Sequence, residues 1–148
     1  MSTEEFEFKS LGYKLKKTQH ILRNFMDDAL KPLGLTTPQY AALSVIELKP
    51  GISNADLARA SFVTAQTMHG IVSNLEKDHL LKRKGDPEHG RILCAELTKE
   101  GHKVMKQAHA IIENVEKIMT HDMSKKDKMA LENLLLVCVK NLNGNRAV

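Results

Sequence analysis

The sequence predicts a mainly α-helical protein with one small β-hairpin, and three observations lead to this fold class. Aromatic residues make up only 4% of the chain and Trp is absent, so the core must consist mainly of Leu, Ile, Val, Met and Ala, a set that favours helices. Apolar residues recur at helical spacing along most of the chain. Only residues 81–97 form two short strand-like runs around a tip rich in Gly, Asp and Pro.

The composition is that of an ordinary globular domain. The chain has 148 residues, of which 42% are hydrophobic and 27% charged, and we expect a single domain over residues 1–148. We find no signal peptide and no apolar run long enough to cross a membrane. The sequence therefore predicts a cytoplasmic protein that does not associate with membranes.

Residues that could support catalysis or metal binding are scattered along the sequence. Cys94 and Cys138 lie far apart without metal-type spacing, and we expect both to be small core residues. His102 and His109 share a helix face but are too far apart to chelate an ion unaided. With no nucleophile–base arrangement and no glycine loop that would cradle a phosphate, we expect neither an enzyme nor a cofactor.

Three helices precede the hairpin in the predicted order. Residues 8–31 form a long amphipathic helix that ends at Pro32 and Gly34. The second helix begins at Thr36, which forms a capping-box pattern with Gln39. A short third helix is opened by Ser53 as its N-cap.

A fourth helix, within residues 61–80, has one apolar and one polar face. Thr64 is its predicted N-cap, and its apolar face carries Met68, Ile71, Val72 and Leu75. The opposite face carries only short polar groups and one Lys, with no acid: Gln66, Thr67, His69, Gly70, Ser73, Asn74 and Lys77. Such groups read base edges and phosphates. Two short capped helices joined by a few residues are typical of a helix-turn-helix. The alternative is an ordinary amphipathic helix with a solvated face.

The hairpin beside this helix pair has the features of a wing. Its incoming strand carries Lys82, Arg83 and Lys84, and Arg91 lies at its tip. A basic hairpin next to a helix-turn-helix suits contact with DNA phosphates. The alternative is a structural hairpin whose tip is solvated.

The chain ends in two further long helices, opened by Thr98 and by Ser124. The apolar stripes of residues 8–35 and 99–148 exceed what a small centre at residues 36–98 can cover, so we predict that they form a homodimer. A two-fold dimer places two recognition helices roughly 34–36 Å apart, one turn of DNA. The alternative is an intramolecular helix bundle in a monomer.

Charge alone does not decide the partner. The formal net charge is +4, which mildly favours an anionic ligand, but residues 36–98 carry as many acidic as basic side chains. A rival function therefore stays open, in which a winged helix docks a protein partner without sequence-specific DNA binding. The salt dependence of binding to random DNA would separate the two functions.

The order of elements and several local strings resemble the MarR family of bacterial transcription regulators. The resemblance covers nearly the whole chain, and it rests on these strings: Leu33-Gly34-Leu35-Thr36 with Gln39 and Leu43, Ser53-Asn54-Ala55-Asp56-Leu57-Ala58, Gln66-Thr67-Met68, Leu75-Glu76-Lys77-Asp78-His79-Leu80, Asp86-Pro87-Glu88-His89-Gly90-Arg91 and Leu97-Thr98-Lys99-Glu100-Gly101. The resemblance implies a winged helix-turn-helix at residues 36–98, flanked by dimerisation helices at 8–35 and 99–148. It also implies a homodimer that binds a pseudo-palindromic operator in double-stranded DNA, usually as a repressor.

The resemblance assigns roles to individual residues. It places the N-terminal part of the recognition helix in the major groove and the wing residue Arg91 in the minor groove, with Asp86 orienting Arg91. The full set of predicted DNA contacts is Ser53, Thr64, Gln66, Thr67, His69, Gly70, Ser73, Lys77, Lys84, Asp86 and Arg91. Gln suits a bidentate contact with adenine, and Arg is attracted to a narrow minor groove.

Gly70 departs from the family pattern, in which a larger and often basic residue is common. A mid-helix Gly costs roughly 1 kcal/mol relative to Ala. The residue is either the result of drift or an allowance for close approach of the helix backbone to DNA.

Members of the family usually respond to small aromatic or phenolic ligands, to oxidants or to metals. The oxidant-sensing branch has a reactive cysteine in the first helix, whereas this chain has none before Cys94. By family analogy, Arg23 and Tyr40 are candidate ligand-binding residues for a small aromatic or phenolic effector, although ordinary packing and surface contacts would explain both.

Overall fold

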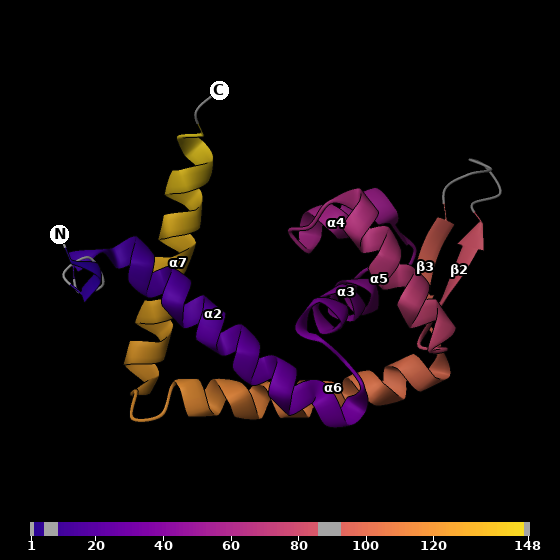
Figure 1. The fold of residues 1–148 in the computed structure, drawn as a ribbon, viewed down its shortest axis with the longest axis horizontal. Coiled ribbons are helices and arrows are strands. Elements are labelled where there is room, and N and C mark those ends of the chain that lie inside the picture. Colours follow the sequence, from indigo (N-terminus) through magenta and orange to yellow (C-terminus); the bar gives the residue numbers. More distant parts are fainter. Residues whose placement is uncertain (1, 5–8, 86–92, 147–148) are drawn as a thin grey trace. The chain divides into compact units, whose positions relative to one another are not determined.

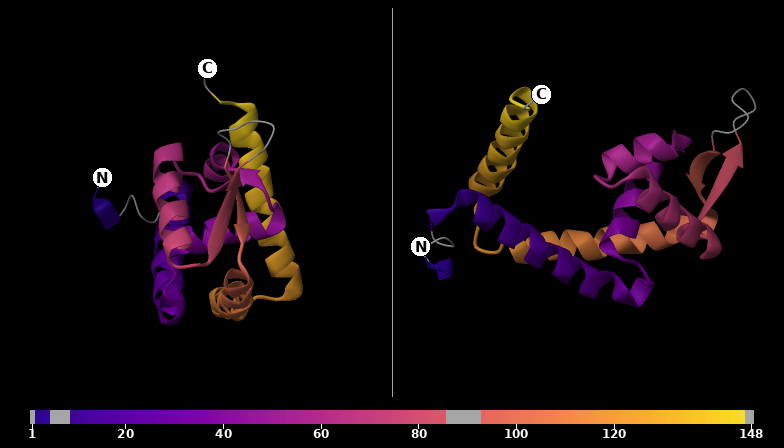
Figure 2. Two further views of the ribbon diagram at one scale, coloured as in Figure 1. Left: turned by 90° about the vertical axis from the view of Figure 1, so that its right-hand side faces the viewer. Right: turned by 45° about the horizontal axis from the view of Figure 1, so that its top comes forward.

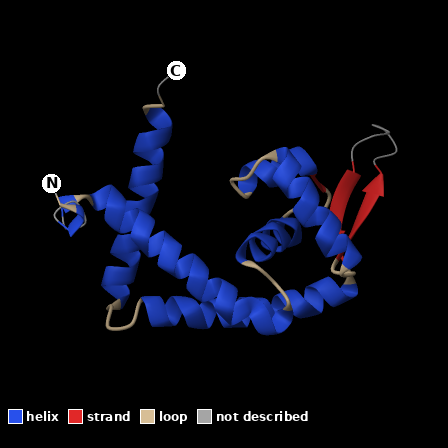
Figure 3. Ribbon diagram, viewed as in Figure 1, coloured by secondary structure: helices blue, strands red, loops and turns tan. Residues whose placement is uncertain are grey.

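The computed structural model describes residues 2–4, 9–85 and 93–146. The chain divides into two compact units, residues 1–115 and 116–148, and each is described by itself. Figure 1 labels the elements, and Figure 3 shows that helices account for most of the fold. The prediction of a mainly α-helical protein with a small sheet is confirmed.

The first long helix, α2, spans Leu11–Leu30. It begins later than the predicted residue 8 because the Ser10 side chain caps it, accepting a 3.1 Å hydrogen bond from the Tyr13 N–H. A 3-10 turn, η1 (Lys31–Leu33), follows. Gly34 then takes a φ of +70°, a left-handed conformation that glycine adopts without steric cost.

Helices α3 (Thr37–Leu48), α4 (Asn54–Ala60) and α5 (Ala65–Lys77) begin at the predicted caps. The capping box of α3 is complete: Thr36 Oγ1 accepts from the Gln39 N–H at 3.3 Å, and the Gln39 side chain accepts from the Thr36 N–H at 3.0 Å. Ser53 and Thr64 cap α4 and α5 through the N–H three residues on. Local sequence therefore determines where these helices begin.

A three-stranded antiparallel sheet adjoins the helices, with strand order β1-β3-β2. Strands β2 (Leu81–Gly85) and β3 (Leu93–Leu97) form the predicted hairpin, with Leu81 opposite Leu97. The third strand, β1 (Ile52–Ser53), was not predicted. It has only two residues, too few to show the alternation by which strands are found in a sequence.

The core of the first unit lies where α3, α5 and the sheet meet α6 (Lys99–Met119). Figure 2 shows these elements from two further directions. The buried side chains come from every part of this unit, and they include Leu30 of α2, Leu43 and Ile46 of α3, Leu57 of α4, Met68, Val72 and Leu75 of α5, Leu81 and Ala95 of the sheet, and Met105, Ala108 and Ile112 of α6. The core thus anchors α5 by the apolar face that its sequence predicts.

Helix α7 (Lys125–Gly144), in the second unit, opens with a capping box between Ser124 and Asp127. None of its residues is buried, and its apolar side chains are exposed, with Leu134 at 63%. Cys138 is exposed as well, so its prediction as a core residue is wrong for the single chain. Cys94, in β3, is partly buried. None of the described helices is apolar over a length that would cross a membrane.

Gly101 in α6 has no room for a side chain. A Cβ at this position would lie 2.0 Å from the Leu80 backbone oxygen and 3.1 Å from Leu97 Cδ2. Gly70 in α5 is the opposite case, because nothing lies within 4 Å of its Cβ position. We expect Gly101→Ala to lower the free energy of unfolding by about 3 kcal/mol, since backbone must move to admit the methyl group.

Urea unfolding at one fixed protein concentration measures this effect. Gly70→Ala is the matched control and should raise the free energy of unfolding by roughly 1 kcal/mol, because Ala is the better helix former. Equal effects of the two substitutions would show that the α6–Leu80 contact is not as close as described.

Asp27 of α2 caps the start of α3 from a distance in sequence. Its Oδ1 accepts a 2.7 Å hydrogen bond from the Thr37 N–H. Hydrogen bonds from the Thr37 side chain and backbone lower the pKa of the Asp27 carboxyl below its ordinary value of 3.8, and the nearby Arg23 charge adds to this effect. The ionised carboxylate also lies at the positive end of the α3 dipole.

A lowered carboxyl pKa stabilises the fold above the unfolded value, and this stabilisation is lost as the pH falls through the folded value. For Asp27 the contribution is therefore complete above pH 3.8 and disappears below it. We expect Asp27→Asn to lower stability at pH 7 by about 0.3–1 kcal/mol. In urea titrations at stepped pH, the difference between wild type and variant should shrink below that pH. A difference that is constant with pH would contradict the role of the charge.

Candidate nucleic-acid interface

Helix α5 presents its polar face outward because its apolar face is buried. Met68 and Leu75 are fully buried, and Val72 is 3% exposed. The predicted contact residues on the other side are exposed: Thr64, Gln66, Thr67, His69, Gly70 and Lys77. The structure therefore brings these residues together on one accessible surface of α5.

The N-terminal end of α5 is an ordered polar site. Thr64 Oγ1 accepts from the Thr67 N–H at 3.1 Å and lies 3.0 Å from Thr67 Oγ1. Gln66 lies within this first turn and is exposed. In all three views of Figures 1 and 2, this end of α5 points to the same side as the ends of β2 and β3 that lead into residues 86–92. One DNA surface could therefore meet both elements.

The open space around Gly70 bears on the choice between drift and close approach. A Cβ atom at this position would have no atom within 4 Å apart from the backbone of its own helix. Internal packing therefore does not require glycine at this position.

Ser73 lies at the edge of the polar face and is half-buried. Its hydroxyl is 3.4 Å from Nη2 of Arg83, which donates to it. Arg83 Nε also donates to Glu76 Oε2 at 3.1 Å, and its side chain is only 18% exposed. The guanidinium thus joins β2 of the hairpin to the C-terminal half of α5.

The basic run Lys82, Arg83 and Lys84 predicts three solvent-facing charges on the hairpin, whereas Arg83 has this internal positioning role. The alternation of side chains along the strand predicts the inward direction of Arg83. Leu81 points into the core, so Arg83, two residues later, shares its face, whereas Lys82 and Lys84 point outward.

Ser53 is engaged at the start of α4. Its hydroxyl donates to Asp56 Oδ2 at 3.0 Å, and Arg59 also donates to the Asp56 carboxylate. The hydrogen bond from Arg59, followed by that from Ser53, lowers the pKa of the Asp56 carboxyl. The Arg59 charge is therefore compensated within α4.

The remaining predicted DNA contacts lie in or next to the hairpin. Lys84 is 62% exposed, and its Nζ lies 3.4 Å from Glu96 Oε2 on the neighbouring strand. Asp86 and Arg91 lie outside the described residues.

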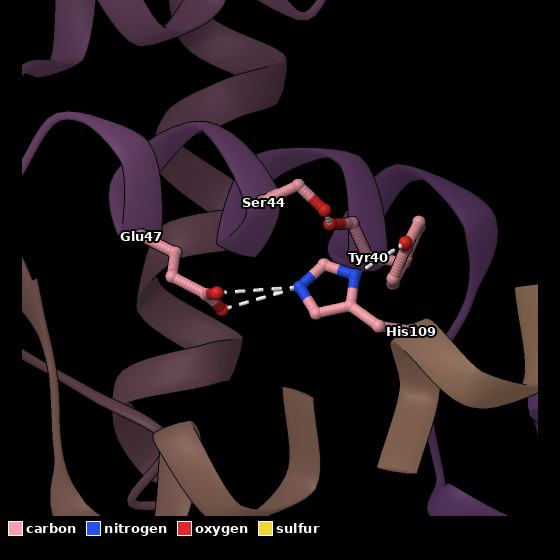
Figure 4. Close-up of polar contacts among 4 residues, drawn as sticks. All are labelled: Tyr40, Ser44, Glu47 and His109. Atoms are coloured by element: carbon pink, nitrogen blue, oxygen red, sulfur yellow. Dashed lines mark hydrogen bonds and ion pairs between the residues drawn. The ribbon is translucent and has the colours of Figure 1, made fainter. Parts of the chain in front are cut away.

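Tyr40, a candidate ligand-binding residue, belongs to a polar network between α3 and α6 (Figure 4). The Tyr40 hydroxyl lies 2.8 Å from His109 Nδ1, and His109 Nε2 lies 3.3 Å from both Glu47 carboxylate oxygens. The Tyr40 and His109 rings contact each other edge to face, with their centroids 5.5 Å apart. Because a carboxylate only accepts hydrogen bonds, a neutral His109 must carry its proton on Nε2 and accept from Tyr40.

The other candidate ligand-binding residue, Arg23, is exposed on α2, and its carbonyl accepts a 3.4 Å hydrogen bond from Thr37 Oγ1 at the start of α3. His102 is exposed on α6. In the described part of the chain, no three His, Cys, Asp or Glu side chains gather in a group that could hold a metal ion.

Comparison with known proteins relates this architecture to one family. A MarR family model matches residues 33–92. The HTH-type transcriptional repressor Rv2887 of Mycobacterium tuberculosis is 38% identical over 102 residues, which cover 69% of this chain and 73% of that protein.

Solved structures of this relative have the same fold. Rv2887 in complex with salicylic acid matches with a TM-score of 0.72 and 31% identity, over 87% of this chain and 96% of the other. Rv2887 in complex with DNA matches with a TM-score of 0.73 and 29% identity, over 87% and 97% of the two chains. The chain is a member of the MarR family of winged-helix, DNA-binding transcription regulators.

Proposed function

We propose that the chain is a repressor that binds a pseudo-palindromic operator as a homodimer, with α5 in the major groove and the hairpin in the adjacent minor groove. The observation that carries this proposal is the exposed face of α5, which bears short polar groups and no acid beside a basic strand. The similarity to Rv2887, whose structure has been determined with DNA, supports DNA as the partner.

In this proposal the base-reading residues lie in the first two turns of α5. Gln66 is suited to adenine, and the Thr64 and Thr67 hydroxyls are suited to phosphates or base edges. His69, Gly70, Ser73 and Lys77 extend the contact along the helix, and Ser53 approaches the backbone from α4. Arg83 acts inside the protein, since its bonds to Ser73 and Glu76 hold α5 against the hairpin.

The hairpin supplies the second groove contact in the proposal. Arg91 would enter the minor groove, Asp86 would orient it, and Lys84 would approach a phosphate. The Lys84–Glu96 ion pair is solvent-exposed and therefore weak, so Lys84 could leave Glu96 for a DNA phosphate at little cost in free energy.

Residues 8–35 and 99–148 are the proposed dimerisation helices. Apolar side chains on α2 and on α7 are exposed in the single chain, among them Leu15 at 50% and Leu142 at 73%. Apolar stripes of this kind usually mark an interface, and the same stripes on a second copy of the chain would cover them.

The proposal includes a small phenolic acid as effector, with Tyr40 and Arg23 as its binding residues. Rv2887, the relative with a salicylic acid complex, supports this class of ligand. A phenolic hydroxyl or carboxylate could replace a partner in the Tyr40–His109–Glu47 network and thereby alter the link between α3 and α6.

Selection of bound sequences from a random DNA pool tests the proposed function. We expect a palindrome whose half-sites lie one helical turn apart, and two chains per site. Fluorescence anisotropy at stepped salt should give a steep negative slope of affinity against salt. A flat slope, with no enriched sequence, would favour the protein-docking function instead.

Gln66→Ala tests the major-groove assignment. We expect affinity for the selected operator to fall by roughly 1–3 kcal/mol, with specificity lost at one base position in each half-site. Gln107→Ala, which removes an exposed Gln from α6, is the matched control and should leave the selected sequence unchanged. Retained specificity in the Gln66 variant would place base reading elsewhere.

Tyr40→Phe tests the effector site with salicylate as the probe, measured by calorimetry. We expect salicylate affinity to fall about five- to tenfold, the effect of one lost hydrogen bond. Tyr13→Phe, on α2, is the control and should bind salicylate as the wild type does. Unchanged binding to the Tyr40 variant would remove this residue from the site.

A further inference from the structure

Phe62, in the turn between α4 and α5, combines two unusual properties. Its side chain is 95% exposed, the highest value for a large apolar side chain in the described part of the chain. Its φ is +59°, in the left-handed region that bulky residues rarely adopt. An exposed ring gains nothing from the core, and a strained backbone is a cost, so stability does not explain this residue.

The hydrogen bonds of the turn fix this conformation. The Phe62 N–H donates to the Arg59 carbonyl at 3.3 Å, and the Val63 N–H donates to the Ala58 carbonyl at 3.1 Å. This pattern is a Schellman motif, which ends a helix with one left-handed residue, usually Gly and sometimes Asn. Phe62 occupies that position. Either of those residues would close the same turn with less strain, whereas Phe adds an exposed ring.

The position of the turn indicates what the ring could contact. Phe62 lies two residues before Thr64, the N-cap of α5, and four before Gln66. This end of α5 points to the same side as the ends of the hairpin strands that lead into residues 86–92 (Figures 1 and 2). The turn that carries Phe62 therefore adjoins the N-terminal end of α5, the surface that we assign to DNA.

We propose that Phe62 is a further DNA-contacting residue whose ring packs against a thymine methyl group at the edge of the major groove. This inference rests on the proposed function of α5. The thymine methyl is the apolar group that DNA displays in the major groove, and Phe is among the side chains that contact it. This apolar contact would add a preference for thymine, which the neighbouring polar side chains of Thr64 and Thr67 do not supply.

Two variants separate a DNA contact from a structural role. Phe62→Asn removes the ring and relieves the strain, because Asn tolerates the left-handed region. Phe62→Leu keeps an apolar side chain in the same strained backbone. We expect the melting temperature of the Asn variant to rise by roughly 2–4 °C, because the backbone strain is relieved. Its operator affinity should nevertheless fall about tenfold, because the ring is lost. The Leu variant should melt as the wild type does and retain affinity within about threefold.

Uracil scanning of the selected operator identifies the contact. Replacing one thymine with uracil in a single half-site removes only one methyl group, and at the contacted position it should weaken wild-type binding about fourfold. The same replacement should have no effect on Phe62→Asn. The salt dependence should be equal in all variants, since no charge changes.

Several outcomes would overturn the proposal. Wild-type affinity in Phe62→Asn would remove the ring from the DNA contact and leave a protein partner as the alternative. Reduced affinity without any uracil effect would place the ring against a deoxyribose and contradict the methyl assignment. Gln66→Ala serves as the reference: if it loses specificity while Phe62→Asn does not, only the Phe62 inference fails, whereas absence of specific binding by the wild type would refute the proposed function itself.

Discussion

Burial of the apolar face of α5 sets the orientation of the elements around it. Met68 and Leu75 have no exposed surface, and they contact a core to which α3, the sheet and α6 all contribute. Because the helix cannot rotate without exposing these side chains, the direction of its polar face is settled by packing. Removing one such side chain typically costs about 2–5 kcal/mol, more than an exposed ion pair such as Lys84–Glu96 contributes.

The charges around α5 serve packing and orientation as well as binding. Arg83 is turned inward to Glu76 and Ser73, Arg59 is compensated by Asp56, and Lys84 lies against Glu96. This explains how residues 36–98 can carry balanced charge and still belong to a DNA-binding family. In the proposed function, short polar groups on α5 and residues of the hairpin tip supply most of the specific contact.

The apolar surfaces of the chain divide into two classes. Those of α3, α5 and the middle of α6 are buried within the first unit, whereas the side chains of α7 are exposed throughout. An amphipathic helix without any buried residue gains little from folding alone, because tertiary packing supplies most helical stability. The structure of the single chain therefore agrees with a protein that is stable as part of a larger assembly.

Local sequence is sufficient to predict the helices, their caps and the hairpin, because Ser53, Thr64 and Ser124 act on N–H groups only three residues away. It also determined the polar composition of the exposed face of α5. Only packing between distant segments produces the pairing of β1 with β3, the hydrogen bonds from Arg83 to Glu76 and Ser73, and the contact of Tyr40 with His109, 69 residues further along. These features join distant segments, and local patterns of hydrophobicity and capping contain no information about such contacts.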